Sequence, residues 1–335
     1  MEVFQFSSAL RQRGITLVEL LVAMFLGVLL LFGVLKVFDS SREGARVQRA
    51  LAAAQDSGRI AIEFLARDIR NADFSGCLAD KNNLTNGLNL DSGAPDFGTN
   101  TYRYYDLGAV LGDTASPGQM IGSKEIIEDT DLLQLVGARP ICDGVINLGA
   151  DQINPLSPLS LAEECEIPNG TVLLVASCQR GDIFVKTAGD YTNIQHSTVV
   201  VEGISNANDA LSTAYTRDTA YLYKPYVYTY FVAEGANGNN ALFRREDDNN
   251  FELIPNVDDF QITFGVDRNS DGLAEDVVDP SGITSVEDSL LIISVKTSVT
   301  VQSPEQVNGS SIRRTYTATT NVRNRSVESN LAINN

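Results

Sequence analysis

The chain has 335 residues and carries 43 acidic side chains against 25 Lys and Arg, a formal net charge of −18. This acidity argues against nucleic acid and anionic lipid surfaces as partners, because both attract basic patches. The single histidine, His196, excludes zinc sites built on two histidines of one helix, and its setting in Q-H-S-T-V-V-V predicts a strand-edge or loop position. The chain has neither a G-x-S-x-G elbow nor a phosphate-binding glycine loop, so we expect no enzyme.

The N-terminal segment combines a short leader that ends in R-Q-R-G with a long apolar run. Residues 1–14 contain Arg11 and Arg13 and end in glycine, and the apolar run extends from Ile15 to Leu35. That run is long enough to cross a bilayer as a helix, and the two arginines before it place the N-terminus in the cytoplasm. Glu19 is costly in lipid, so it needs either a partner or a functional role. The alternative is a helix-end glutamate that snorkels to the interface.

The region after Leu35 has the pattern of an amphipathic helix. Apolar and small residues recur there at spacings of three and four, which predicts one helix face packed against a protein surface. These residues are Val47, Leu51, Ala54, Gly58, Ile62, Leu65, Ile69 and Ala72. No proline occurs in residues 1–94, so we expect one continuous helix from about Ile15 to Ala72. Such a helix is roughly 85 Å long at 1.5 Å per residue.

From Cys77 onward, short apolar runs alternate with turn residues, which predicts a β-rich domain. The expected strands are Leu132–Gly137, Thr171–Ala176, Ile183–Lys186, Thr198–Glu202, Tyr221–Ala233, Ala241–Arg245, Phe260–Val266, Leu290–Gln302 and Arg313–Val322. The aromatic run Y-L-Y-K-P-Y-V-Y-T-Y-F at 221–231 predicts a sheet with one tyrosine-rich face, and a carbohydrate-facing strip is the alternative. The expected fold class is α+β, with a long N-terminal helix packed on a mostly antiparallel sheet.

The four cysteines do not form a C-x-x-C pair, which argues against zinc ribbons and thioredoxin-like sites. An even number in an exported chain favours two disulfides, and four buried free thiols are the alternative. Three pairings are open to four cysteines. We expect Cys165–Cys178, which closes a short loop, and therefore Cys77–Cys142, which ties the end of the first helix to the β domain.

The run D-R-N-S-D-G-L-A-E-D at 267–276 begins like a calcium-binding loop. Asp267, Asn269 and Asp271 match the first half of the EF-hand pattern, but its twelfth position is Val278, which excludes an EF-hand. Calcium is therefore a candidate ligand only if other carboxylates complete the oxygen cage, and Glu275, Asp276 and Asp279 are the nearest. The competing interpretation is a polar hairpin turn. The adjacent carboxylates elsewhere in the chain are interpreted as solvated turns rather than acid–base pairs, and no other cofactor is expected.

The stretch R-G-I-T-L-V-E-L-L-V-A resembles the prepilin signal of type IV pilins and type II secretion pseudopilins. The resemblance implies that a prepilin peptidase cleaves after Gly14 and that Ile15 becomes the N-methylated N-terminus. It also implies that Glu19 pairs with the N-terminal amine of a neighbouring subunit during assembly. Meeting that amine offsets the cost of burying both charges. Ile15 departs from the Phe usual in major pilins, which weakens a major-pilin interpretation.

Four further segments together resemble minor pilins of the PilW type. They are F-L-A-R-D-I-R-N-A-D-F-S-G-C at 64–77, the hairpin at 230–245, F-Q-I-T-F-G-V-D at 260–267 and T-N-V-R-N-R at 320–325. The resemblance implies a structural subunit of the type IV pilus that takes part in assembly initiation or a tip priming complex. The implied partners are other minor pilins, the major pilin, a tip adhesin and the prepilin peptidase.

Two other functions stay open at this point. A J-type minor pseudopilin of type II secretion has the same helix and signal, and a membrane-anchored binding module or enzyme is a more distant alternative. The expected location is the inner membrane before assembly, and the periplasm and pilus afterwards. The expected regions are a leader at 1–14, a membrane and assembly half-helix at 15–38, an amphipathic half-helix at 39–76, a β-rich domain at 77–326 and a flexible tail at 327–335.

Overall fold

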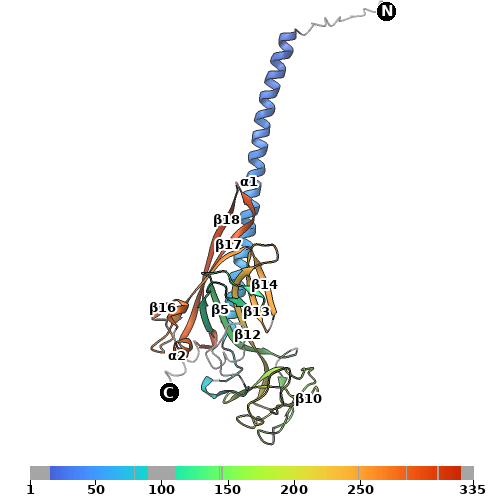
Figure 1. The fold of residues 1–335 in the computed structure, drawn as a ribbon, viewed down its shortest axis with the longest axis vertical. Coiled ribbons are helices and arrows are strands. Elements are labelled where there is room, and N and C mark those ends of the chain that lie inside the picture. Colours follow the sequence, from blue (N-terminus) through green and yellow to red (C-terminus); the bar gives the residue numbers. More distant parts are fainter. Residues whose placement is uncertain are drawn as a thin grey trace, which may run out of the picture.

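The computed structural model describes residues 16–325 apart from 79, 90–109, 143, 145, 248, 284 and 308. One long helix, α1 (Leu17–Asn71), stands out of a β-rich head, and its second half is embedded in that head (Figure 1). The expected α+β class and the continuous helix are therefore confirmed. The leader, Gly14, Ile15 and the tail expected from residue 327 lie outside the described residues.

The head is built on two larger sheets and two small ones. The first contains nine strands, with β12 at its centre. One edge of β12 pairs with β8 and β13, and the other edge pairs with β5 and β6. Its strands are β1 (Leu84–Asn86), β2 (Val110–Thr114), β5 (Asp131–Pro140), β6 (Ile146–Asn147), β8 (Val172–Ala176), β9 (Gly181–Val185), β12 (Tyr221–Glu234), β13 (Asn240–Glu246) and β14 (Asn249–Pro255). Among the described strands, β1 and β9 pair in parallel and the other pairs are antiparallel.

The second sheet has four strands in the order β16, β15, β17, β18 and lies along the embedded half of α1 (Figure 1). Its strands are β15 (Val257–Val266), β16 (Asp276–Val278), β17 (Ile292–Val307) and β18 (Ser310–Asn321). The small sheets are β10 (Ala188–Gly189), β11 (Asn193–Gln195) and β7 (Leu159–Ser160), and the pair β3 (Met120–Ile121) and β4 (Lys124–Glu125). The short helices are η1 (Lys81–Asn83), η3 (Pro280–Gly282) and α2 (Val286–Leu290).

The main core forms where α1 meets both larger sheets. Small residues on the buried face of the helix allow a close approach, and that face is completed by Leu65 and Ile69, both fully buried. Opposite them lie Tyr230 of β12, Phe260 of β15 and Val299 of β17. The buried face also contains Ala50 and Ala61, whereas Val47, Leu51 and Ile62 of the expected stripe are only half-buried. The buried face is therefore rotated slightly from the predicted stripe toward the alanine and glycine positions, because small side chains permit the closest packing.

A distal lobe around β7, β10 and β11 has its own apolar core and extends beyond the C-terminal end of α1 (Figure 1). One expected strand is wrong here. Residues 198–202 form a loop in which Val199 and Val200 are exposed, and Val201 makes only an isolated bridge to Ile204. The start of this loop is held by a side chain instead of a strand, because the amide of Thr198 donates to the carboxylate of Asp209 at 2.6 Å. An apolar run without a neighbouring strand to pair with does not become a strand.

Candidate functional site

The membrane half of α1 is a continuous exposed apolar surface. Every residue from Thr16 to Arg46 is exposed, and the first buried residue of the helix is Ala50. The helix is long and apolar enough to cross a membrane. Exposed apolar surface of this extent requires lipid or another protein surface to cover it. The burial pattern separates an exposed part of the helix from a packed part, and the division into two functionally different halves stays a prediction.

Glu19 lies at the start of this surface, in the first turn of the helix. Thr16 is the N-cap, and its hydroxyl accepts a hydrogen bond from the amide of Glu19 at 3.3 Å. The Glu19 carboxylate in turn accepts from the amide and the hydroxyl of Thr16, both at 3.3 Å, which completes a capping box. Within the described residues Glu19 has no basic partner, so its charge is available to one from outside the chain.

A buried ionic cluster attaches α1 to the head. Asp68 is 5% exposed, and its carboxylate pairs with Arg244 of β13 at 3.1 Å and accepts a hydrogen bond from the hydroxyl of Tyr230. Burial, reinforced by the adjacent Asp68, raises the pKa of Tyr230 well above its ordinary value, so this hydroxyl remains a donor. Tyr226, Tyr228 and Tyr230 of the aromatic run pack in the core cluster that includes α1, whereas Tyr221 and Tyr223 pack in a neighbouring cluster with β8 and β9. The sheet therefore has a tyrosine-rich face turned inward, and the carbohydrate-facing strip is not supported.

A second cluster holds the point where the chain leaves α1. Arg325, which is 5% exposed, contacts Asp73 at 2.9 Å and donates to the carbonyl oxygen of Ile292 at 2.9 Å. Lys81 approaches the same carboxylate at 3.5 Å. Sequence reasoning assigned no role to Asp68, Asp73 or Arg325. The signal was nevertheless present, because these residues lie in the segments 64–77 and 320–325 that carried the resemblance.

The structure contains two disulfides, but the expected pairing is wrong. The bonds are Cys77–Cys178 and Cys142–Cys165. Cys165 and Cys178 are close in sequence, but the extended strand β8 runs between them and carries them apart. The parallel pairing of β1 with β9 brings the segment after α1 beside the β8–β9 turn, and the Cα atoms of Cys77 and Cys178 are 4.6 Å apart. The first disulfide thus ties the end of the helix to the lobe, although through Cys178 rather than Cys142.

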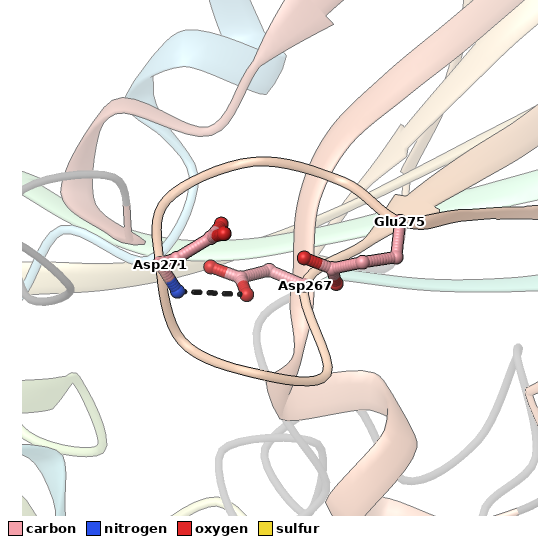
Figure 2. Close-up of side chains that lie close together, drawn as sticks. All are labelled: Asp267, Asp271 and Glu275. Carbon is pink, nitrogen blue, oxygen red and sulfur yellow. Dashed lines mark hydrogen bonds between the residues drawn. The ribbon is translucent and has the colours of Figure 1, made fainter.

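The acidic loop between β15 and β16 brings three carboxylates together. Ligand oxygens of Asp267, Asp271 and Glu275 lie within 4.8 Å of one another, and Figure 2 shows these side chains lying close together across the loop. Asn269 does not join this group but bonds to Asp271 as part of the turn. Asp267 accepts the amides of Asp271 and Gly272 at 3.2 and 2.8 Å, so the loop has the hydrogen bonds of a polar turn. Calcium at this position stays a prediction.

His196 is buried and serves to connect loops of the distal lobe. Its Nδ1 lies 3.0 Å from the carbonyl oxygen of Asp209, and its Nε2 lies 3.0 Å from that of Ser157. The ring also packs edge-on against Phe184. These contacts confirm the expected loop position, directly after β11, and they give the histidine a packing role within the lobe core.

Comparison with known proteins matches two families, one in the N-terminal segment and one in the head. A family described as "Prokaryotic N-terminal methylation motif" matches residues 10–35, and one described as "Type IV Pilus-assembly protein W" matches residues 229–330. Neither the curated proteins nor the solved structures yield a match. The first region covers the leader end and the exposed apolar surface with Glu19. The second includes β13, which contributes Arg244 to the attachment of α1, and the segment after β18, which contributes Arg325.

The two matched families are structural components of pili rather than enzymes. Their positions agree with the geometry, since one marks the exposed half of the helix and the other marks the sheets against which the second half packs. The chain is therefore a PilW-like type IV pilin with a prepilin signal, related to the minor pilins of the type IV pilus.

Proposed function

We propose that this minor pilin takes part in the initiation of pilus assembly, as a member of a tip priming complex with other minor pilins and a tip adhesin. The observation that carries the proposal is Glu19, a carboxylate without a basic partner among the described residues, at the start of an exposed apolar half-helix. Such a surface is stable in the membrane before assembly, and among neighbouring apolar helices afterwards. The major pilin is the partner that would continue the filament below this complex.

The proposal includes processing by the prepilin peptidase. Cleavage after Gly14 and methylation of Ile15 would create an amine four residues before Glu19 in the sequence. In the membrane, the capping box with Thr16 occupies the carboxylate of Glu19. Once the helix enters a filament core, the carboxylate loses access to water, and an amine from an adjacent subunit neutralises it. A buried charge left without such a partner costs about 3–5 kcal/mol.

The shape of the head supports a position at the tip. The distal lobe extends beyond the C-terminal end of α1, on the side opposite the membrane half (Figure 1). In a filament whose subunits stack with parallel helices, that side faces the next subunit outward. A lobe on that side would obstruct the stacking of a further pilin, so it is best accommodated in a subunit that has no pilin above it. In that position the lobe can contact an adhesin.

The experiment replaces Glu19 by Ala and by Gln in the full-length chain, expressed at matched levels. We expect Glu19→Ala to reduce pull-down of partner minor pilins and surface pilus yield severalfold. Glu19→Gln should be intermediate, because glutamine preserves the capping box but not the charge. The matched control is Glu43→Gln, an exposed acidic residue of the same helix outside the apolar run, which should behave as wild type.

Processing is measured in the same strains by the N-terminal mass, which should correspond to methylated Ile15 in every variant. Normal pull-down and pilus yield with Glu19→Ala would show that the carboxylate is a tolerated interface residue. Intact pili combined with a loss of protein secretion would assign the chain to a type II secretion system instead.

A further inference from the structure

Three arginines follow the apolar run on one face of α1. Arg42, Arg46 and Arg49 are spaced by four and three residues, which places them on one side of a helix. All three are exposed, and they precede the first buried residue, Ala50. We call Arg42, Arg46 and Arg49 the arginine stripe. It occupies the segment between the membrane half of the helix and the head.

The arginine stripe has no acidic partner within the described part of the chain. Asp39 and Glu43 lie three residues before Arg42 and Arg46, a spacing that permits ion pairs, yet neither pair forms. The guanidinium of Arg42 instead lies 4.5 Å from the ring centre of Phe38, one turn nearer the membrane. Arg49 likewise turns toward the N-terminus, where its Nε donates to the carbonyl oxygen of Ala45 at 3.3 Å.

The stripe is unusual for its side of the membrane. Basic residues close to a span are normally concentrated on the cytoplasmic side. Here Arg11 and Arg13 precede the span, whereas the stripe places three arginines shortly after it, on the side of the disulfide-bonded head. Such a distribution opposes the required orientation of insertion. The three arginines are therefore expected to have a role after the helix has been inserted, because they do not favour its insertion.

Their depth matches the layer of lipid headgroups. At 1.5 Å per residue, Arg42 lies about 6 Å and Arg46 about 12 Å beyond Phe38, the last apolar residue before the stripe. The headgroup layer on each side of the hydrocarbon is about 5–7 Å thick. Side chains of a helix lean toward its N-terminus, here toward the membrane, so both guanidinium groups can reach that layer. Arg49, about 16 Å beyond Phe38, is too distant.

We propose that Arg42 and Arg46 form a binding site for the phosphates of anionic phospholipid headgroups, with Phe38 as the aromatic anchor at the interface. The site would hold the subunit at a defined depth before assembly, and it rests on the membrane orientation under the proposed function. The net charge of −18 argues against anionic lipids as partners of the acidic head. The stripe is a local exception, separated from the head along the helix.

The absence of tryptophan from the chain permits a direct test. Leu35→Trp places one fluorophore on the stripe face, two turns before Arg42 and within the lipid. The full-length variant is reconstituted in phosphatidylcholine vesicles containing either brominated phosphatidylcholine or brominated phosphatidylglycerol, and quenching reports which lipid contacts the helix. We expect phosphatidylglycerol to be preferred at least about threefold, and salt to weaken the preference.

The double substitution Arg42→Gln and Arg46→Gln should abolish this preference. Arg59→Gln is the matched control, because Arg59 is an exposed arginine of the same helix farther from the membrane. Equal quenching by both lipids in the Leu35→Trp chain overturns the proposal. A preference that survives the double substitution also overturns it. If the doubly substituted chain then also loses pull-down of partner pilins in cells, the arginine stripe binds carboxylates of another protein instead of lipid phosphates. The vesicles contain no other pilin, so the result is independent of the Glu19 experiment.

Discussion

At the residue scale, Gly58 marks the closest approach of α1 to the C-terminal sheet. A Cβ atom added there would lie 2.2 Å from Cδ2 of Tyr316 in β18. We expect Gly58→Ala to lower the free energy of unfolding by about 1–3 kcal/mol, because the overlap outweighs the roughly 1 kcal/mol gained in helix propensity. The measurement is denaturant unfolding of the detergent-solubilised chain, followed by circular dichroism.

Gly44→Ala provides the matched control, because an added Cβ at that position has no neighbour within 4 Å. It should be neutral or stabilise the helix by up to about 1 kcal/mol. Tyr316→Ser should relieve the overlap and restore part of the stability of Gly58→Ala. Equal stability of the Gly58→Ala and Gly44→Ala chains would mean that the helix and β18 are not in close contact.

At the element scale, the two disulfides should contribute unequally to stability. Cys77–Cys178 spans a sequence separation of 101 residues and Cys142–Cys165 one of 23. Chain entropy predicts a cost of about 4–5 kcal/mol for losing the first and about 3 kcal/mol for losing the second. Thermal unfolding of Cys77→Ser/Cys178→Ser and Cys142→Ser/Cys165→Ser chains tests the order. Peptide mapping without reduction should recover the pairs 77–178 and 142–165, and any other pair would contradict the fold of the lobe.

The acidic loop between β15 and β16 is a second element that can be tested. The carboxylates of Asp267, Asp271 and Glu275 repel one another, so a bound calcium ion should relieve that repulsion and raise the melting temperature by a few degrees. EDTA should reverse the rise, and Asp271→Asn should abolish it. Asp218→Asn, a change at an exposed acidic residue in the distal lobe, should not. A melting temperature insensitive to calcium would leave the loop as a turn closed by its own amides.

At the scale of the whole molecule, the membrane half of α1 and the head should be separable. None of the residues from Thr16 to Arg49 is buried, so a chain that begins at Glu43 retains the whole packed face of the helix. We expect it to be soluble, to form both disulfides and to melt at the same temperature as the full-length chain. A chain that begins at Ala61 lacks the packing of Ala54 and Gly58, and it should melt at least about 4 °C lower. Equal melting of the two shortened chains would show that the helix contributes little to the head.

The sequence by itself determined the features that depend on local periodicity or on a contiguous motif. The apolar run with Glu19 and the three-and-four spacing up to Ile69 were sufficient to predict α1, because helix contacts are local in sequence. Strand β12 was predicted for a similar reason, since Tyr226, Tyr228 and Tyr230 alternate with other residues and mark a face that must be covered.

Only the tertiary structure decided which distant segments meet. The cysteine pairing depends on β1 joining β9, and no local pattern encodes that pairing. The role of Arg325 depends equally on β18 ending beside Asp73 at the exit from α1. Residues 198–202 were misjudged because strand propensity requires a neighbouring strand, and the fold supplies none there. Contacts between distant residues are set by how the elements pack, so their chemistry becomes visible only once that packing is known.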